Sequence, residues 1–137
     1  MANNLWLNLP VQDLARSRAF FTELGFTFND IHGRTDLLSM TVGEPGVIVN
    51  LFPAAAFAQI AGAPVSDAPQ TAEVLLSLGA GSREEVDTLT AKARAAGATV
   101  FGEPNEVQGW MYGCGFADLD GHRWNLLFMD LAKLPKA

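Results

Sequence analysis

The first pattern in the chain is an alternation of aliphatic and other residues over residues 5–11, which predicts a β-strand. Because successive side chains of a strand point to opposite faces, its aliphatic face is expected to pack against a helix. The opposite face then carries Trp6 and Asn8. The helix should follow directly, with Asp13 as its N-cap and Gly25 as its C-terminal stop.

Three shorter runs complete a first module. They predict strands over residues 26–29, 37–42 and 47–52, divided by glycine-containing turns. In the last of these strands Asn50 should lie on the same kind of face as Trp6, because Val47, Val49 and Leu51 form the aliphatic face. The pattern of residues 37–42 does not decide which of its faces is buried.

The same order returns after a proline- and alanine-rich linker over residues 53–71, in which one helical turn is expected. A strand is predicted over residues 73–78, and Ser82 with Glu85 forms a capping box for a helix over residues 83–96. Further strands are predicted at residues 99–102, 110–116 and 123–129.

This repeat predicts an α+β fold with a single domain over residues 1–137. The domain contains two βαβββ modules, over residues 4–52 and 72–130. Each four-stranded sheet should carry one helix on one face and leave its other face open. In the second module Glu73 and Asn125 are expected on the open face, as Trp6 and Asn50 are in the first.

Composition narrows the classes of function. The chain has 137 residues, of which 49% are hydrophobic, and a net charge of −6, which argues against nucleic-acid and anionic-membrane partners. One cysteine and two histidines exclude a cysteine-cluster or multi-histidine metal site within one chain. No apolar run approaches the roughly 20 residues of a membrane span, and no signal peptide is visible, so a cytoplasmic location is expected.

Two segments resemble a known family. The opening NLPVQDLARSRAFFTELGF and the closing GWMYGCGFADLDGHRWNLLFMD resemble the first strand and helix and the final hairpin of the vicinal oxygen chelate superfamily. It includes glyoxalase I, bleomycin and fosfomycin resistance proteins and extradiol dioxygenases. The resemblance implies that curved mixed sheets form a cup-shaped cleft. It also implies a homodimer in which modules of different chains combine.

The resemblance further implies where metal-dependent members hold their ion, on the first and last strands of each module. These positions correspond to Trp6, Asn50, Glu73 and Asn125. Only Glu73 is a usual ligand for a transition metal, because indole is a donor and the two amides are neutral. We therefore expect no metal cofactor, although a divalent ion stays an alternative.

Several residues are candidates for binding a small molecule. Glu73 in an apolar cup should have a raised pKa and could act as a general base or bind a cation; simple solvation at a strand end is equally compatible with the pattern. Asn50 and Asn125 could hydrogen-bond a ligand or other buried polar groups. The strand over residues 110–116 adds candidates whose facing the pattern leaves open, namely Trp110, Tyr112 and Cys114, and Asn8 completes the set.

Together these observations favour a protein that binds a small aromatic or cationic organic molecule in a metal-free cup. A divalent-metal-dependent lyase, isomerase or dioxygenase is the first alternative. A metal-free enzyme with Glu73 as catalytic base is the second, and Glu73→Gln would separate it from simple binding. His122, in a turn before the last strand, is expected to be structural, and a nucleophilic role for Cys114 is disfavoured by the absence of a second cysteine.

Overall fold

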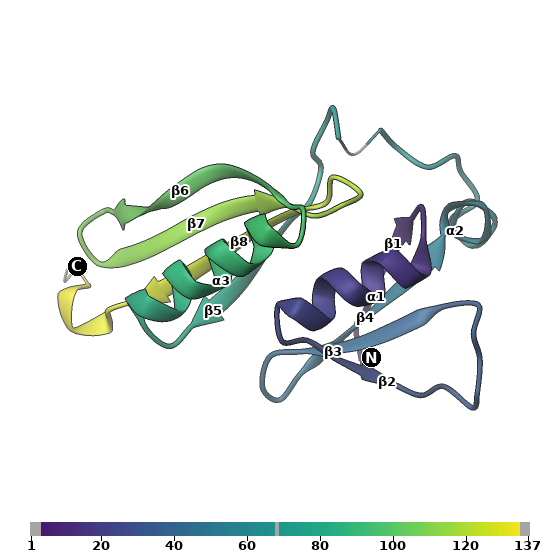
Figure 1. The fold of residues 1–137 in the computed structure, drawn as a ribbon, viewed down its shortest axis with the longest axis horizontal. Helices are drawn as coiled ribbons and strands as arrows, with labels where there is room; N and C mark the ends of the chain where they lie inside the picture. The colour runs from purple at the N-terminus through teal and green to yellow at the C-terminus, as the bar shows by residue number, and fades with distance from the viewer. Residues whose placement is uncertain (1–3, 68, 135–137) are drawn as a thin grey trace. The chain divides into compact units, whose positions relative to one another are not determined.

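The structure is a computed structural model that describes residues 4–67 and 69–134. By its internal contacts the chain divides into two compact units, with the boundary between Asp67 and Ala68. Each unit contains a four-stranded mixed sheet and a long helix (Figure 1). The predicted α+β fold of two βαβββ modules is confirmed.

In the first unit the strand order is β1-β4-β3-β2, in which β1 and β4 are parallel and the other pairs antiparallel. The short helix α2 follows β4 directly, where the sequence predicted one helical turn. The elements are β1 Trp6–Val11, α1 Leu14–Glu23, β2 Thr27–Asn29, β3 Leu38–Val42, β4 Val47–Pro53 and α2 Ala54–Ala61.

The helix α1 begins and ends at the residues that the sequence indicated. The side chain of Asp13 accepts a hydrogen bond from the backbone N–H of Arg16 at 3.1 Å. At the other end Gly25 adopts a positive φ, and the N–H of Phe26 bonds to the carbonyl of Phe21, which closes a Schellman motif. Buried aromatic and aliphatic side chains from this helix and from β3 and β4 form the core of the unit: Phe20, Phe21, Met40, Val49 and Leu51.

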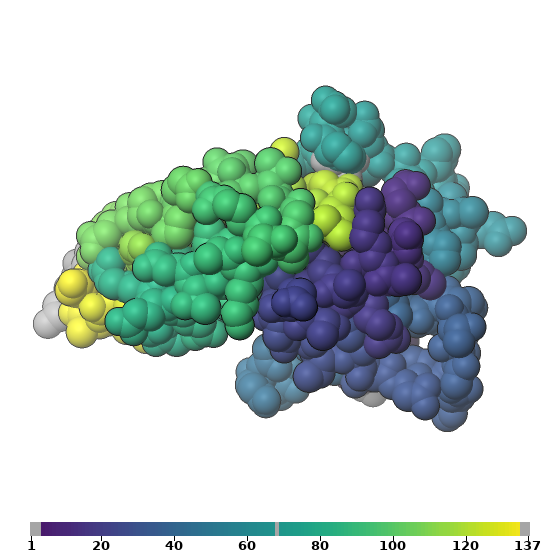
Figure 2. Space-filling view, in the orientation of Figure 1, coloured from purple at the N-terminus to yellow at the C-terminus, as the bar shows by residue number. Residues whose placement is uncertain are grey.

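In the second unit the order is β5-β8-β7-β6, again with the first and last strands of the module parallel. In the space-filling view α3 (green) hides most of β8 (Figure 2). The elements are β5 Leu75–Ala80, α3 Arg83–Ala95, β6 Thr99–Val107, β7 Met111–Ala117, β8 Arg123–Met129 and the 3-10 helix η1 Leu131–Lys133.

The helix α3 uses the same terminal devices as α1. The hydroxyl of Ser82 accepts from the N–H of Glu85 at 3.0 Å, while the Glu85 carboxylate accepts from the N–H of Gly81, one residue before the position that a capping box would use. Val86 on this helix packs with Cys114 and Leu126 in the core of the unit.

Two strands differ from their predicted bounds by more than one residue. β5 begins at Leu75, two residues later than expected, because its pairing with β8 starts at Leu75 and Arg123. β6 continues to Val107 because it pairs with β7 across two irregularities in the strand register. The local sequence pattern does not indicate such pairing. Within the described part of the chain, no helix is long and apolar enough to cross a membrane.

Candidate functional site

The open face of the first sheet is hollowed into a groove of about 440 Å³. Alternation along β1, β3 and β4 places every second side chain in it, opposite the face that α1 covers. The residues that line it are Trp6, Asn29, Ile31, Arg34, Leu37, Ser39, Thr41, Ile48, Asn50 and Phe52.

Strand register explains why Trp6 and Asn50 share this groove. Trp6 pairs with Ile48 on β4, and Ile48 pairs with Thr41 on β3, so the three side chains emerge side by side. Asn50 is opposite Ser39 in the same way. Trp6 is 62% exposed, so its indole presents a large apolar surface at the groove.

Hydrogen bonds orient the amide groups near the groove. Asn50 Nδ2 donates to Asn8 Oδ1 at 3.0 Å, and Asn29 Nδ2 donates to Thr41 Oγ1 at 2.9 Å. The first bond joins two of the predicted site residues and leaves the carbonyl oxygen of Asn50 as a possible acceptor for a ligand. Asn8 therefore supports the groove from the neighbouring strand.

Arg34 is a groove residue that the sequence analysis missed, because it lies in the loop between β2 and β3. Two hydrogen bonds shape this loop: the N–H of Arg34 donates to the carbonyl of Ile31 at 2.9 Å, and the N–H of Gly33 donates to Asp30 Oδ1 at 3.0 Å. The guanidinium makes a two-point contact with Asp36 at 2.9 and 2.7 Å. This hydrogen bonding holds the pKa of Asp36 below its ordinary value.

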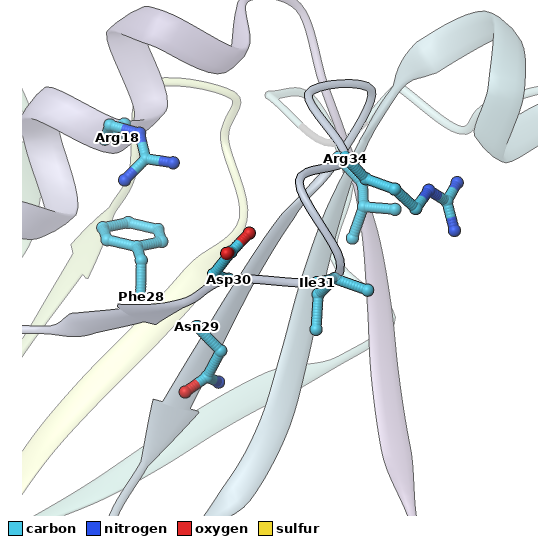
Figure 3. Close-up of a pocket in the computed structure, with 7 residues that line it drawn as sticks. Arg18, Phe28, Asn29, Asp30, Ile31 and Arg34 are labelled. Carbon is cyan, nitrogen blue, oxygen red and sulfur yellow. The ribbon is translucent and has the colours of Figure 1, made fainter.

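A smaller cavity of about 190 Å³ adjoins the groove at the same loop. It shares Asn29, Ile31, Arg34 and Leu37 with the groove. Figure 3 shows the guanidinium of Arg18 above the ring of Phe28, while Arg34 extends away from both. The Arg18 guanidinium carbon lies 4.8 Å from the centre of that ring, within cation–π range.

The open face of the second sheet carries Asn125, as predicted from its position in β8. Its Oδ1 atom is buried and makes no hydrogen bond within the described part of the chain, and the same holds for Arg123 Nε two residues earlier. The Arg123 guanidinium lies 4.6 Å from the ring of Phe101, which covers Gly115. Phe101 lies within the strand predicted over residues 99–102, but neither it nor Arg123 was assigned a face, so both were missed.

Glu73 does not occupy the strand position that the sequence predicted. It precedes β5 by two residues and is exposed. Within the described part of the second unit, its carboxylate is therefore not enclosed in a cup. The first strand residue on the open face is Leu75 instead.

Tyr112 and Cys114 face α3 and do not line the open face, so their predicted place in the site is wrong. Tyr112 donates a 2.6 Å hydrogen bond to Asp87 Oδ1 on α3, which raises the pKa of Tyr112. Thr90 Oγ1 lies 2.9 Å from Cys114 Sγ, and burial raises the pKa of the thiol. The open-face positions of β7 nearest Cys114 are Gly113 and Gly115, which gave no hydrophobic signal.

The remaining candidates lie in turns. Trp110 precedes β7 and is half-buried, and its carbonyl accepts a 2.7 Å bond from the N–H of Asp130.

Asp118, in the turn between β7 and β8, is 7% exposed and accepts from the backbone N–H groups of Asp120 and His122 and from the indole of Trp124, each at 3.0 Å. The backbone of His122 thus belongs to a structural turn, in agreement with the sequence.

The positions implied for a metal do not fit one. The indole of Trp6 offers no lone pair, Asn50 and Asn125 offer only neutral amide oxygens, and Glu73 is exposed outside its strand. Across residues 4–67 and 69–134, no three histidine, cysteine, aspartate or glutamate side chains gather in one place. The donor set accordingly gives no basis for metal chemistry at these positions.

Comparison with known proteins gives a consistent result. Residues 4–40 match the family model of the bleomycin resistance protein-like N-terminal region. A hypothetical protein from S. aureus is 37% identical, with a TM-score of 0.84 over 93% of this chain and 95% of that chain. No match is found among curated proteins.

Two more distant solved structures show the same fold. A glyoxalase-related enzyme from Fulvimarina pelagi is 19% identical, with a TM-score of 0.80 over 93% of this chain and 88% of that chain. A genomically encoded fosfomycin resistance protein from Listeria monocytogenes is 20% identical, with a TM-score of 0.69 over 97% and 98%.

Proposed function

This chain belongs to the vicinal oxygen chelate superfamily, and we propose that within it the chain binds a small organic molecule without a metal ion. The groove on the open face of the first sheet carries this proposal. Its volume of about 440 Å³ falls in the range of small-molecule sites, about 300–1,000 Å³. The reaction types of the superfamily vary too widely for the fold to name one.

The lining of the groove suits a flat molecule with hydrogen-bonding substituents. Trp6, Ile48 and Phe52 offer apolar surface, and aromatic rings stack on an indole with about 0.5–1.5 kcal/mol beyond the area that they bury. Asn50 and its neighbours supply acceptors and donors that fix the orientation of such a ligand.

We extend this proposal to a homodimer in which the modules of two copies combine. Large apolar side chains stand exposed on the open face of the second sheet, namely Leu75, Phe101 and Met129, and aromatic and methionine side chains are enriched at interfaces between subunits. Light scattering after size exclusion should give twice the chain mass of 14.7 kDa. A mass of one chain at high micromolar concentration would contradict the dimer.

Trp6→Ala is expected to weaken binding of a neutral flat probe, 2-naphthamide, by about tenfold, because the probe loses its stacking surface. Trp6 is 62% exposed, so the variant should keep the stability of the wild-type chain. Calorimetric titration of both proteins measures the effect.

Trp110→Ala is the matched control, because this tryptophan lies in a turn of the second unit. Equal affinity of Trp6→Ala and wild type would overturn the assignment of the groove. Near-stoichiometric metal after loading with manganese, nickel, zinc or iron and desalting would favour the metal-dependent alternative instead.

A further inference from the structure

We propose that the groove selects organic anions, aryl carboxylates in particular, and that Arg34 is the residue that binds the carboxylate. This inference rests on the proposed function and names the class of ligand for the same groove.

The one charge among the described side chains that line the groove is positive, and its partner Asp36 lies outside the lining. Arg34 is the one ionisable side chain among the described residues that line the groove, and the others are apolar, hydroxyl or amide residues. The lining itself therefore offers a cation no carboxylate, and the nearby Asp36 carboxylate is engaged by Arg34, whereas an anion would meet a guanidinium. Hydrogen bonds between ionised partners are shorter and about twice as strong as neutral ones.

The loop between β2 and β3 holds Arg34 at the groove, and Arg18 takes no part in this. The turn closed by the carbonyl of Ile31 fixes the backbone of Arg34. The guanidinium of Arg34 points away from the guanidinium of Arg18 (Figure 3). The Arg18 guanidinium lies over the ring of Phe28 instead. Recognition of the anion thus depends on a single arginine.

The carboxylate of Asp36 makes the same kind of contact with Arg34 that we infer for the carboxylate of the ligand. The Asp36 carboxylate engages the guanidinium at two points, which is the geometry of an arginine–carboxylate pair. Both side chains are exposed, at 50% and 65%, and exposed ion pairs contribute little to stability. A ligand carboxylate can therefore take the place of Asp36 while the Asp36 carboxylate returns to water.

The net charge of −6 favours cationic ligands over anionic ones, and the sequence analysis included cationic ligands. Charges beyond about 8–10 Å are largely screened at physiological salt. A contact with Arg34 acts inside that distance, so the groove lining decides the sign of the preferred ligand.

The test uses three probes with one ring system and different charge: 2-naphthoate, 2-naphthamide and naphthalen-2-ylmethylammonium. Calorimetric titrations should give wild type an affinity for 2-naphthoate about tenfold or more above that for the other two. Arg34→Gln should bring the ratio of naphthoate to naphthamide affinity close to one. Asp36→Asn should raise the affinity for naphthoate, because the competing carboxylate is removed.

Arg94→Gln is the matched control, since Arg94 forms an exposed ion pair with Glu103 in the second unit and does not line the groove. Its probe affinities should equal those of wild type. If naphthamide binds and naphthoate binds no tighter, or if Arg34→Gln keeps the preference, the anionic class is rejected while the binding function stands. If none of the three probes binds wild type, the proposed function itself fails.

Discussion

Replacing Asp118 with alanine is expected to lower the free energy of unfolding by about 3 kcal/mol, because the buried indole N–H of Trp124 and two part-buried backbone N–H groups lose their common acceptor, and a buried donor that loses its acceptor costs about 1–3 kcal/mol. The Asp118 carboxylate accepts from the backbone of Asp120 and His122 and from the indole of Trp124. It therefore ties the β7–β8 turn to the largest fully buried side chain of the second unit. Urea unfolding followed by tryptophan fluorescence measures the loss.

Asp130→Ala is the comparison, because that carboxylate accepts from the N–H of Ala132 at the exposed end of the chain's last helix. It should cost less than about 1 kcal/mol, the usual value of an exposed cap. A similar loss for both variants would show that the turn does not depend on Asp118.

The same carboxylate should make stability depend on pH. Burial raises the pKa of Asp118, and the positive charge of His122 opposes this in part. Because the folded pKa lies above the unfolded value of about 3.9, the contribution of Asp118 is complete below that pH and is lost as the pH rises through the folded value. The stability of wild type minus that of Asp118→Asn should therefore fall over this window.

Gly113→Ala is expected to destabilise the second unit by about 3 kcal/mol, at the upper end of the usual overpacking cost. A Cβ atom at this position would lie 2.6 Å from the carbonyl oxygen of Leu126 and 2.5 Å from Leu127 Cδ2. The first contact is with the backbone of the central strand β8, which cannot move without breaking its pairing with β7. Thermal unfolding gives the effect directly.

Gly115→Ala separates this backbone clash from the general cost of replacing a strand glycine. The three atoms nearest to a Cβ atom there all belong to the ring of Phe101, with Cζ at 2.6 Å, and that ring is half exposed and can turn aside. We expect a loss of about 1 kcal/mol. Equal losses at both positions would argue against the strand register described for β7 and β8.

The sequence predicts the facing of a side chain where the residues on both sides of it alternate clearly between apolar and polar. Trp6 and Asn50 were assigned to one face because their neighbours on both sides are aliphatic, and the structure brings them to one groove. Cys114 could not be assigned, because the glycines beside it carry no apolar signal for either face. Its orientation is set by pairing with Leu126, a contact with a distant part of the chain.

Non-local geometry also explains the remaining differences. Glu73 was placed in a strand because the local pattern continues to it, but pairing with β8 begins only at Leu75. Arg34 lies in a loop whose course depends on the Ile31–Arg34 turn and the Asp30 side chain, so no periodicity could bring it to the groove.

The irregular register of β6 has a consequence for self-association. β6 is an outer strand of its sheet, and its pairing with β7 is interrupted on both sides of Gly102, with Pro104 inside the second interruption. A proline lacks the backbone donor and a bulge bends the strand, so this border offers a poor template for another chain. The addition of strands from other chains, which would produce fibres, is therefore unfavourable at this edge of the sheet. The cause is the backbone geometry of β6, and it does not depend on the acidic charge of the protein.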